Sequence, residues 1–391
     1  MDERPPRTYL DVASAWPLRP EVRAALADAA EVAWADPARR HAEGRAARDL
    51  LDRATATLAA RLGAPDDGVV WTSGGTEAVH LAVLGAARAA ALRGEDRRHV
   101  VAGAVEHSSV LRACERLRDA HGFELDVVGV DGSGVVDPEA VRAVLRRDTL
   151  AVHLQHANHE VGAVHPTHEV GSLAREVGAV LHVDACQTVG QLGVTLDQVG
   201  ADLLSLSAAK LGGPHGVGAL LLGPRARVAA LQEGDERQRR RRAGLEDVVG
   251  AAGAAVALEV ASAAMPTERS ARELVRRRLR DGLAAVDDVE VHGPLADAHP
   301  GIVAASALYV AGDALVTELD AAGFAVHSGS SCAQESGAPS HVLVAMGALT
   351  HGHVRASFGP EVTVDDADRF VAAYADAVAR LRDAGGRRDR G

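Results

Sequence analysis

Short apolar runs alternate with longer amphipathic segments through the first 260 residues. The runs are rich in Val and Leu and end at polar or glycine residues, which indicates buried strands. The segments between them carry Ala, Leu and Arg at helical spacing, as in 44–62. Strands that alternate with helices predict an α/β fold with a mainly parallel sheet. The expected strands are 69–72, 100–105, 125–130, 150–155, 180–184, 203–207 and 218–222.

The alternation ends after about residue 260. A long helix is expected over 246–264 and a second one over 268–286. Short strands and single helices follow, and a glycine- and serine-rich loop, SGSSCAQESGAPS, interrupts them. We therefore expect a large domain over residues 17–260 and a smaller α+β domain built from residues 1–16 and 261–391. The elements expected in the C-terminal part are strands 289–292, 301–310 and 354–358 and helices 314–322 and 364–384.

Composition narrows the class of protein. The 391 residues include 42 Lys+Arg and 54 Asp+Glu, and the net charge of −12 does not favour nucleic acid or an anionic membrane. The first ten residues lack the apolar core of a signal peptide, and the most apolar stretch, 248–265, contains Glu259. We expect a buried helix there rather than a membrane span. Three scattered cysteines form neither a disulfide framework nor a CxxC pair, so we expect a cytoplasmic protein with free thiols and no metal site.

The chain contains a single lysine, Lys210, among otherwise arginine-only basic positions. Arginine stays protonated in proteins, whereas lysine can lose its proton and attack a carbonyl. Lys210 is therefore a candidate nucleophile, although the count alone also fits a chance survivor in an arginine-rich composition.

Three motifs give Lys210 a chemical setting. In TSGGTEAVH (72–80), Gly75 and Thr76 lie where a strand turns into a helix, which suits a phosphate or merely a tight turn. In LHVDACQTVG (181–190), Asp184 ends a strand, where it can contact a ligand or cap the next segment. In LLSLSAAKLGG (203–213), a strand delivers Lys210 into a glycine-rich loop beside Ser207. Together the motifs predict a site in which lysine forms a Schiff base with pyridoxal phosphate.

The order of these motifs resembles the class V aminotransferase family of fold-type I pyridoxal-phosphate enzymes, and in particular its cysteine desulfurases of the NifS/IscS branch. The resemblance runs over nearly the whole chain. Its most specific part is the SGSSC loop followed by PSHVL. The other matching segments are YLDVASAWP (9–17), RHAEGRAAR (40–48), VEHSSVLRACE (105–115), HANHEVGAV (156–164) and VRASFG (354–359).

The resemblance implies a role for each candidate cofactor residue. Lys210 would form the Schiff base, and Asp184 would keep the pyridine nitrogen protonated so that the ring takes up electrons. Gln187 would donate to the ring phenolate oxygen, and His107 would stack on the ring and move protons. The remaining cofactor contacts would come from Gly75, Thr76, His159 and Ser207.

The resemblance also implies the reaction. Arg355 would bind the substrate carboxylate in a forked contact, with Asn158 beside the substrate. Cys332 would attack the sulfur of L-cysteine, leaving L-alanine and a persulfide for transfer to an acceptor protein. Cys114 and Cys186 would be ordinary packed thiols. A homodimer is implied, with no membrane and no direct nucleic-acid contact.

Four positions depart from the family pattern. His159 stands where the family has Asn, so its charge would depend on pH. Ala209 replaces a histidine of the family, and Trp16 replaces a small residue. The family segment Arg-Ser-Gly-Thr keeps its arginine here as Arg242, but Leu245 stands in place of its threonine. These changes leave other readings open: a different class V enzyme, such as an aminotransferase or a C–S or selenocysteine lyase, or a degenerate homologue without activity.

Overall fold

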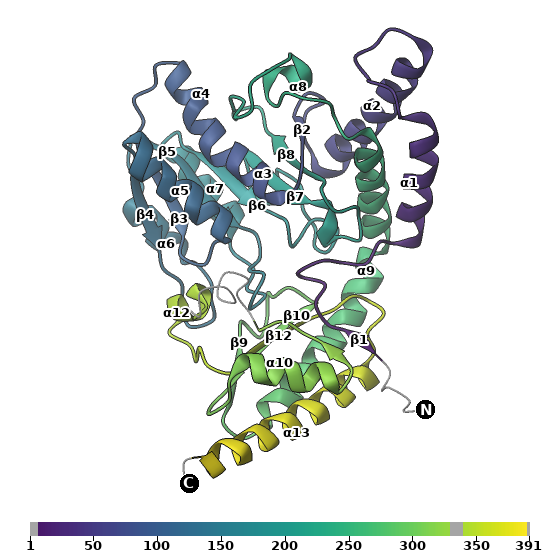
Figure 1. The fold of residues 1–391 in the computed structure, drawn as a ribbon. Helices are drawn as coiled ribbons and strands as arrows, with labels where there is room; N and C mark the ends of the chain where they lie inside the picture. Colours follow the sequence, from purple (N-terminus) through teal and green to yellow (C-terminus); the bar gives the residue numbers. More distant parts are fainter. Residues whose placement is uncertain (1–6, 329–338, 389–391) are drawn as a thin grey trace.

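The two larger sheets of the described residues lie one in each half of the molecule (Figure 1). The computed structural model describes residues 7–328 and 339–388. The larger sheet has seven strands, and five of them run parallel in the order β7-β6-β5-β3-β4. β8 is antiparallel to both of its neighbours, which confirms an α/β fold with a mainly parallel sheet. In sheet order the strands are β2 (Val69–Thr72), β8 (Gly218–Leu222), β7 (Leu203–Ser207), β6 (Val180–Asp184), β5 (Thr149–Gln155), β3 (His99–Gly103) and β4 (Glu124–Val128).

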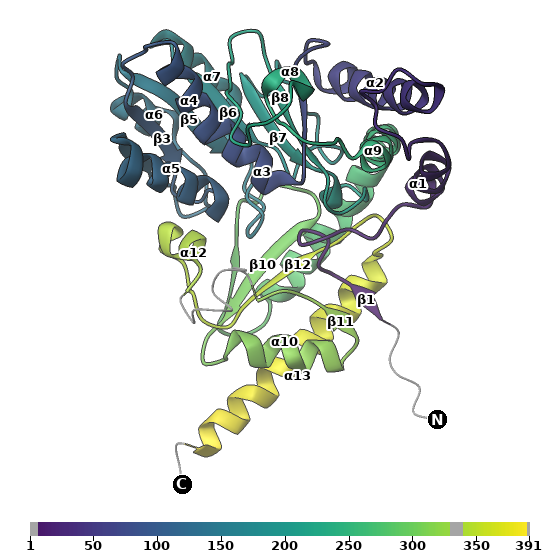
Figure 2. The ribbon, with the colours of Figure 1, turned by 45° about the horizontal axis from the view of Figure 1, so that its top comes forward.

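Helices cover both faces of this sheet (Figure 2). Alternate side chains of a strand point to opposite faces, so Leu181 and Val183 join one apolar cluster while Val100 and Ala102 join another. The first cluster includes residues of α2 (Ala42–Leu62) and α7 (Thr167–Glu176), and the second includes residues of α5 (Ser108–His121). The other elements of this half are α1 (Pro20–Val32), α3 (Gly75–His80), the π-turn η1 (Leu81–Gly85), α4 (Ala86–Leu92), α6 (Pro138–Val144), the 3₁₀ turn η2 (Ala208–Lys210) and α8 (Arg237–Arg240).

A single long helix, α9 (Val248–Ala284), connects the two halves. The prediction of two helices over 246–264 and 268–286 is therefore wrong. Pro266 lies inside the helix, where it removes one backbone hydrogen bond, but packing against α1, α2 and α13 (Val364–Arg388) holds both sides of it together. The apolar part of α9 is long enough to cross a membrane by composition alone, yet 56% of that window is buried inside the protein. Its hydropathy is thus accounted for by internal packing.

The smaller sheet is antiparallel, in the order β12-β10-β9, and α9 and α13 pack beside it. The N-terminal segment crosses to this half, where β1 pairs in parallel with β11 and Asp11 bridges to Ser357. This pairing and helices α1 and α12 are absent from the sequence-based expectations. The proposed boundary near residue 260 lies within α9. The elements of this half are β1 (Thr8–Tyr9), β9 (Val289–His292), β10 (Ile302–Ala307), α10 (Gly312–Ala321), β11 (Phe324–Ala325), α12 (His341–Met346), β12 (His353–Ser357) and α13.

Candidate active site

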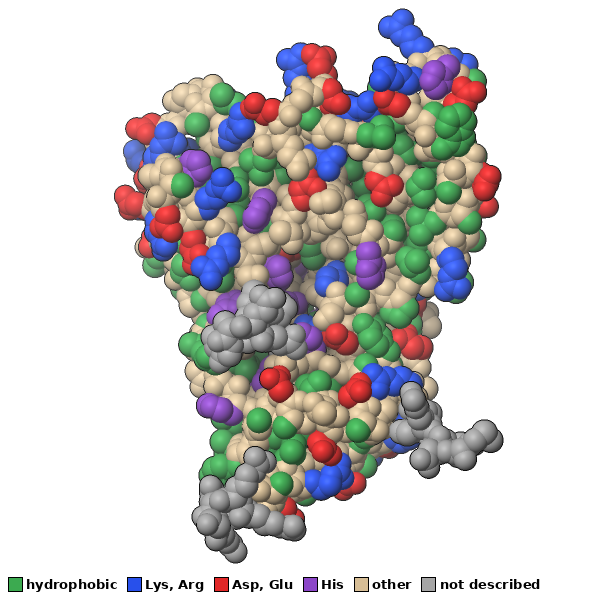
Figure 3. Space-filling view, in the orientation of Figure 1, with side chains coloured by type: hydrophobic (Ala, Val, Ile, Leu, Met, Phe, Trp, Pro, Cys, Tyr) green, Lys and Arg blue, Asp and Glu red, His purple; other side chains and the backbone are tan. Residues whose placement is uncertain are grey.

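A cavity of about 290 Å³ opens where the strand ends of the large sheet meet the N-terminal segment and β12. In Figure 3, histidine side chains gather around the hollow between the two halves of the molecule. Nine of the residues predicted for the site line this cavity, namely Gly75, Thr76, His107, His159, Asp184, Gln187, Ser207, Lys210 and Arg355. Among these nine, the residues farthest apart in the sequence, Gly75 and Arg355, are separated by 280 positions.

Lys210 projects into the cavity from the end of the η2 turn. Its Nζ donates to the carbonyl oxygen of Ala13 over 2.8 Å and to that of Ser14. Burial lowers the pKa of Lys210, and the charge of Arg355 lowers it further, against the opposing effect of nearby acids. The lowered pKa increases the fraction of neutral amine, and the neutral amine is the form of lysine that attacks a carbonyl.

Asp184 ends β6 and faces the same cavity, with 8% of its surface exposed. Its Oδ1 accepts hydrogen bonds from the backbone N–H of Cys186 over 3.0 Å and from Ser205 Oγ over 3.2 Å. The neighbouring Gln187 donates through Nε2 to Ala13 O over 2.9 Å. The carboxylate is thus held in one orientation by two donors behind it.

The turn after β2 is formed by two glycines, and a larger side chain there would fill the space beside them. Gly74 has φ of +149°, a conformation that L residues rarely adopt. A Cβ placed on Gly75 would lie 2.7 Å from Cys186 Sγ and 3.4 Å from Ser207 Cβ. Glycine is therefore required here by the close approach of the facing strands, and the turn keeps its backbone open to the cavity beside Thr76.

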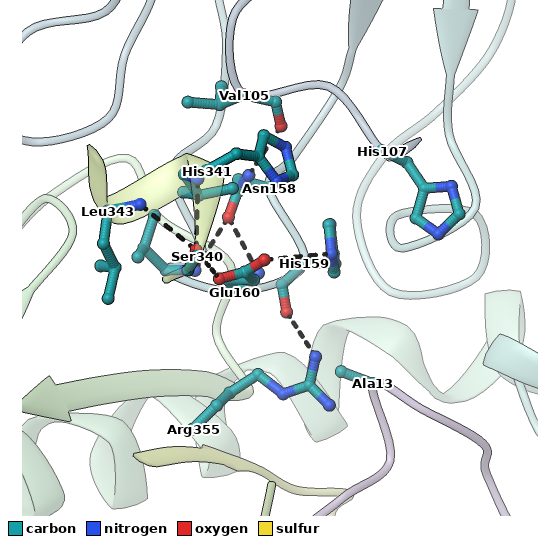
Figure 4. A network of polar contacts seen from close by, with 12 residues as sticks. Ala13, Val105, His107, Asn158, His159, Glu160, Ser340, His341, Leu343 and Arg355 are labelled. Atoms are coloured by element: carbon teal, nitrogen blue, oxygen red, sulfur yellow. Dashed lines mark hydrogen bonds and ion pairs between the residues drawn. The ribbon is translucent and has the colours of Figure 1, made fainter. Parts of the chain in front are cut away.

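His107 caps the N-terminus of α5 and lies beside His159 at the edge of the cavity (Figure 4). Its Nδ1 accepts the backbone N–H of Ser109, so in the neutral ring the proton is on Nε2. The two histidine rings meet edge to face, with centroids 5.4 Å apart. Burial, followed by the charges of His107 and Arg355, holds the pKa of His159 well below its usual value. His159 is therefore neutral around pH 7, and the expected change of its charge is displaced to acidic pH.

Arg355, on β12, is held by two residues of the N-terminal segment and by the backbone of His159. Its Nη2 donates to Asp11 Oδ1 over 2.6 Å and to Ser14 Oγ over 2.8 Å, and its Nη1 donates to the carbonyl oxygen of His159 over 3.0 Å. Asp11 and Ser14 belong to YLDVASAWP, a segment whose individual residues received no role. Arg355 is buried, and these three hydrogen bonds fix the direction of its guanidinium before any ligand arrives.

Asn158 does not line the cavity. Its amide donates to Val105 O over 3.1 Å and accepts from the backbone N–H groups of Glu160 and Val161, and it is fully buried (Figure 4). These contacts shape the turn that carries His159, and they leave the predicted substrate contact of Asn158 without support from its geometry. The same turn reaches α12, because Ser340 Oγ donates to Glu160 Oε2 over 2.6 Å.

The three cysteines have different surroundings. Cys114 is buried in α5, where burial raises the pKa of its thiol. Cys186 is half-buried and lines the cavity beside Gly75. Burial also raises the pKa of Cys186. Cys332 lies outside the described residues.

The positions that depart from the family pattern lie around the site. Trp16 is buried below the guanidinium groups of Arg19 and Arg272, at 5.4 and 5.8 Å from the ring centroid. Leu245 is 61% exposed, and Arg242 donates through Nε to Glu77 over 3.0 Å. Ala209 lies in η2 and accepts from the backbone N–H of Trp16.

The fold and the cavity together define a fold-type I pyridoxal-phosphate enzyme: a lone lysine, an acid at a strand end and a glycine-lined turn face one another across the end of a mainly parallel sheet. The model of the class V aminotransferase family matches residues 8–370, and the chain belongs to this family.

Curated relatives and solved structures agree with this assignment. The chain is 35% identical to cysteine desulfurase IscS of Dictyoglomus turgidum over 96% of this chain and 95% of the relative. It is 38% identical to cysteine desulfurase IscS of Anaeromyxobacter sp. strain Fw109-5, over 88% and 85%. A solved NifS-like protein superposes with a TM-score of 0.88 at 26% identity, covering 96% of this chain and all of that one. The structure of DndA from Streptomyces lividans superposes with a TM-score of 0.76 at 31% identity, over 90% and 99%.

The residues present fit pyridoxal phosphate, the cofactor of this family. The Gly75 turn is a cradle that a Cβ would close. The cavity also offers one amine, one carboxylate and the hydroxyls of Thr76 and Ser207, which match an aldehyde, a pyridine nitrogen and a phosphate.

Proposed function

We propose that this protein is a pyridoxal-phosphate-dependent cysteine desulfurase that converts L-cysteine to L-alanine and keeps the sulfur as a persulfide on Cys332. The observation that carries the proposal is the convergence of the only lysine, the Asp184 carboxylate and the buried Arg355 guanidinium on one cavity. The relatives named cysteine desulfurase over nearly the full length of the chain support the choice of reaction.

Each cofactor contact follows from the position of a side chain. Lys210 would hold the cofactor covalently, Asp184 would pair with its ring nitrogen, and Gly75, Thr76 and Ser207 would hold its phosphate. His107 and Gln187 would bound the ring. Pyridoxal phosphate supplies an aldehyde that binds amines and a ring that takes up electrons from the substrate.

Arg355 would bind and orient the substrate. Its guanidinium already faces the cavity, and a planar donor fork matches a carboxylate. The amino group of Lys210 lies across the same cavity, where it can take a proton from one carbon and return it to another. Both groups are fixed by hydrogen bonds to the N-terminal segment, through Ser14.

Cys332 would carry the sulfur. Its thiolate attacks the sulfur of the bound cysteine, a sulfur–sulfur bond forms, and the carbon–sulfur bond of the substrate breaks. The carbon keeps the bonding electron pair and takes a proton, which gives L-alanine. Two contacts on either side of the Cys332 segment support this role: His327 lines the cavity, and Ser340 contacts Glu160, the residue after His159.

The test is a comparison of products. The cofactor-loaded protein should form L-alanine from L-cysteine and release sulfide when a thiol reductant is added. Cys332→Ala should form neither, whereas Cys114→Ser, a matched cysteine variant away from the cavity, should behave as the parent. A lyase that needs no enzyme thiol would keep full alanine formation in Cys332→Ala, and a degenerate homologue would form no alanine at all.

The assembly and location of the enzyme are part of the same proposal. We propose a cytoplasmic homodimer that passes sulfur to an acceptor protein. A mass of two chains in light scattering, at concentrations used for activity, supports the dimer. A mass of one chain in active protein would contradict it.

A further inference from the structure

Four polar side chains form a buried hydrogen-bond chain that ends at Asp184. His153 Nδ1 lies 3.2 Å from His182 Nδ1, and His182 Nε2 lies 3.2 Å from Ser205 Oγ. Ser205 Oγ in turn donates to Asp184 Oδ1. The two histidines and the serine are at most 1% exposed, and none of them lines the cavity. This series of hydrogen bonds therefore reaches Asp184 from the interior of the sheet, on the side away from the cavity.

The strand register brings these residues together. β5 pairs with β6 so that His153 lies opposite His182, and β6 pairs with β7 so that Asp184 lies opposite Ser205. His182 and Asp184 are two residues apart on one strand and share a face of the sheet. The residues that alternate with them belong to the apolar core on the other face. One polar track thus crosses three neighbouring strands.

The direction of the hydrogen bonds follows from proton counting. Burial lowers the pKa of His153 to about 4 and holds that of His182 well below its usual value, so each ring is neutral and carries one proton. Ser205 gives its proton to Asp184 and therefore accepts one from His182 Nε2. His182 Nδ1 is then a lone pair, and the facing His153 Nδ1 carries the proton. Every donor along the chain points toward Asp184.

We propose that His153, His182 and Ser205 are positioning residues that orient the Asp184 carboxylate for its contact with the ring nitrogen of pyridoxal phosphate. This inference rests on the proposed function only through the cofactor role of Asp184. Hydrogen bonds in series polarise one another, and bonds to a charged acceptor are the strong ones. Groups of this kind orient the ligands of metal sites in the same way.

The hydrogen-bond chain ends at His153 on the side away from Asp184. His153 Nε2 is buried and has no hydrogen-bond partner among the described residues. No second donor or acceptor there competes for the His153 ring, so the only contact that sets its tautomer within the described structure is the one with His182.

The test measures cofactor binding rather than turnover. Ser205→Ala removes the donor next to Asp184, and we expect the cofactor-free protein to bind pyridoxal phosphate on the order of 10-fold more weakly. The visible absorption maximum of the bound cofactor should also shift. His153→Leu should change both quantities in the same direction by a smaller amount. His153→Asn should restore them, because the Asn amide nitrogen can occupy the position of Nδ1.

His99 provides the matched control. It is as buried as His153 and lies in the same sheet, but it contacts Thr149 and Asp126, which do not belong to the hydrogen-bond chain that ends at Asp184. His99→Leu should lower the melting temperature and leave cofactor affinity and absorption unchanged. If Ser205→Ala and His153→Leu behave like His99→Leu, the positioning role is overturned and the residues only pack the core.

A second measurement needs no disruptive variant. Nitrogen-15 spectra of histidine-labelled parent protein should show a neutral ring protonated on Nδ1 for His153 and on Nε2 for His182, with the His153 signals assigned by their loss in His153→Asn. The opposite tautomers, or a charged ring, would overturn the proposed chain. Absence of alanine formation by the parent protein would instead contradict the proposed function and would leave both of these readouts intact.

Discussion

The two sides of the cavity are built in different ways. The side proposed for the cofactor consists of residues at strand ends and turns of one sheet, namely Gly75, Thr76, Asp184, Ser207 and Lys210. The side proposed for the substrate is built around Arg355 of β12, which contacts Asp11 and Ser14 of the N-terminal segment and the carbonyl of His159 in the turn after β5. Asp11 and Arg355 are 344 residues apart in the chain. The cofactor side is thus fixed by the backbone of a single sheet, whereas the substrate side exists only after distant segments have paired.

The largest effect is expected on the cofactor side, from Lys210. Lys210→Ala should abolish covalent attachment of pyridoxal phosphate, because the chain contains no other lysine. Lys210→Arg is the matched control, since it keeps a positive charge but cannot act as the amine nucleophile. Borohydride reduction and peptide mapping measure the attachment. Reduced cofactor on any other residue, or none on the parent protein at saturating cofactor, would refute the assignment.

Acid should destabilise the folded protein as a whole, and with it both sides of the cavity. Burial lowers the pKa of His153, His156 and His165 to about 4, and that of His299 and His353 to about 3. Between these values and the unfolded value of about 6.5, the unfolded chain binds protons that the folded one does not. The free energy of unfolding should therefore fall below about pH 6.5, by up to about 1.4 kcal/mol per pH unit for each histidine. Urea unfolding at pH 7.5, 6.5 and 5.5 measures this, and equal values would contradict the buried neutral rings.

On the substrate side, Arg355→Lys separates the two roles of the cavity. A forked contact with a carboxylate becomes a point charge, and the loss of a charge-assisted hydrogen bond is worth about 1.5–3 kcal/mol. The KM for L-cysteine should rise about 10-fold or more while the affinity for pyridoxal phosphate stays unchanged. Steady-state kinetics and a cofactor titration provide the two numbers. An unchanged KM would place the substrate carboxylate elsewhere.

The smallest effect is expected at Asp11. Its carboxylate neutralises part of the Arg355 charge, and Asp11→Asn removes that charge while keeping the shape of the side chain. Ser14 and the carbonyl of His159 still orient the guanidinium. We expect the KM for L-cysteine to fall a few-fold, as measured by alanine formation. A raised KM would show that Asp11 is needed to hold Arg355 in place.

Most of the large sheet could be predicted from the sequence. Apolar runs that end at polar residues predicted 69–72, 180–184, 203–207 and 218–222 residue for residue, because strands that are buried on both faces of a sheet show as continuous apolar segments. The break expected between residues 264 and 268 was wrong, because tertiary packing continues α9 through this stretch, Pro266 included. The two-residue strands β1 and β11 are too short to leave any pattern.

The same contrast holds for the site. Strand-end motifs predicted residues that do line the cavity, because each of these residues lies at or just after the end of its own strand. Asp11 and Ser14 could not be singled out, since only the pairing of the N-terminal segment with the distant small sheet brings them to Arg355. Asn158 illustrates a different limit of sequence-based prediction. Its motif lies in the turn that reaches the cavity, but the side-chain amide of Asn158 is taken up by hydrogen bonds with the backbone of that turn.

The fate of the substrate sulfur tests the central claim most directly. The cofactor-loaded protein is given one equivalent of L-cysteine, and its peptides are analysed by mass spectrometry beside an assay for L-alanine. We predict one extra sulfur atom on the peptide that contains Cys332, together with one equivalent of L-alanine. Extra sulfur on the peptides of Cys114 or Cys186, or L-alanine formed with no sulfur bound to the protein, would contradict the mechanism.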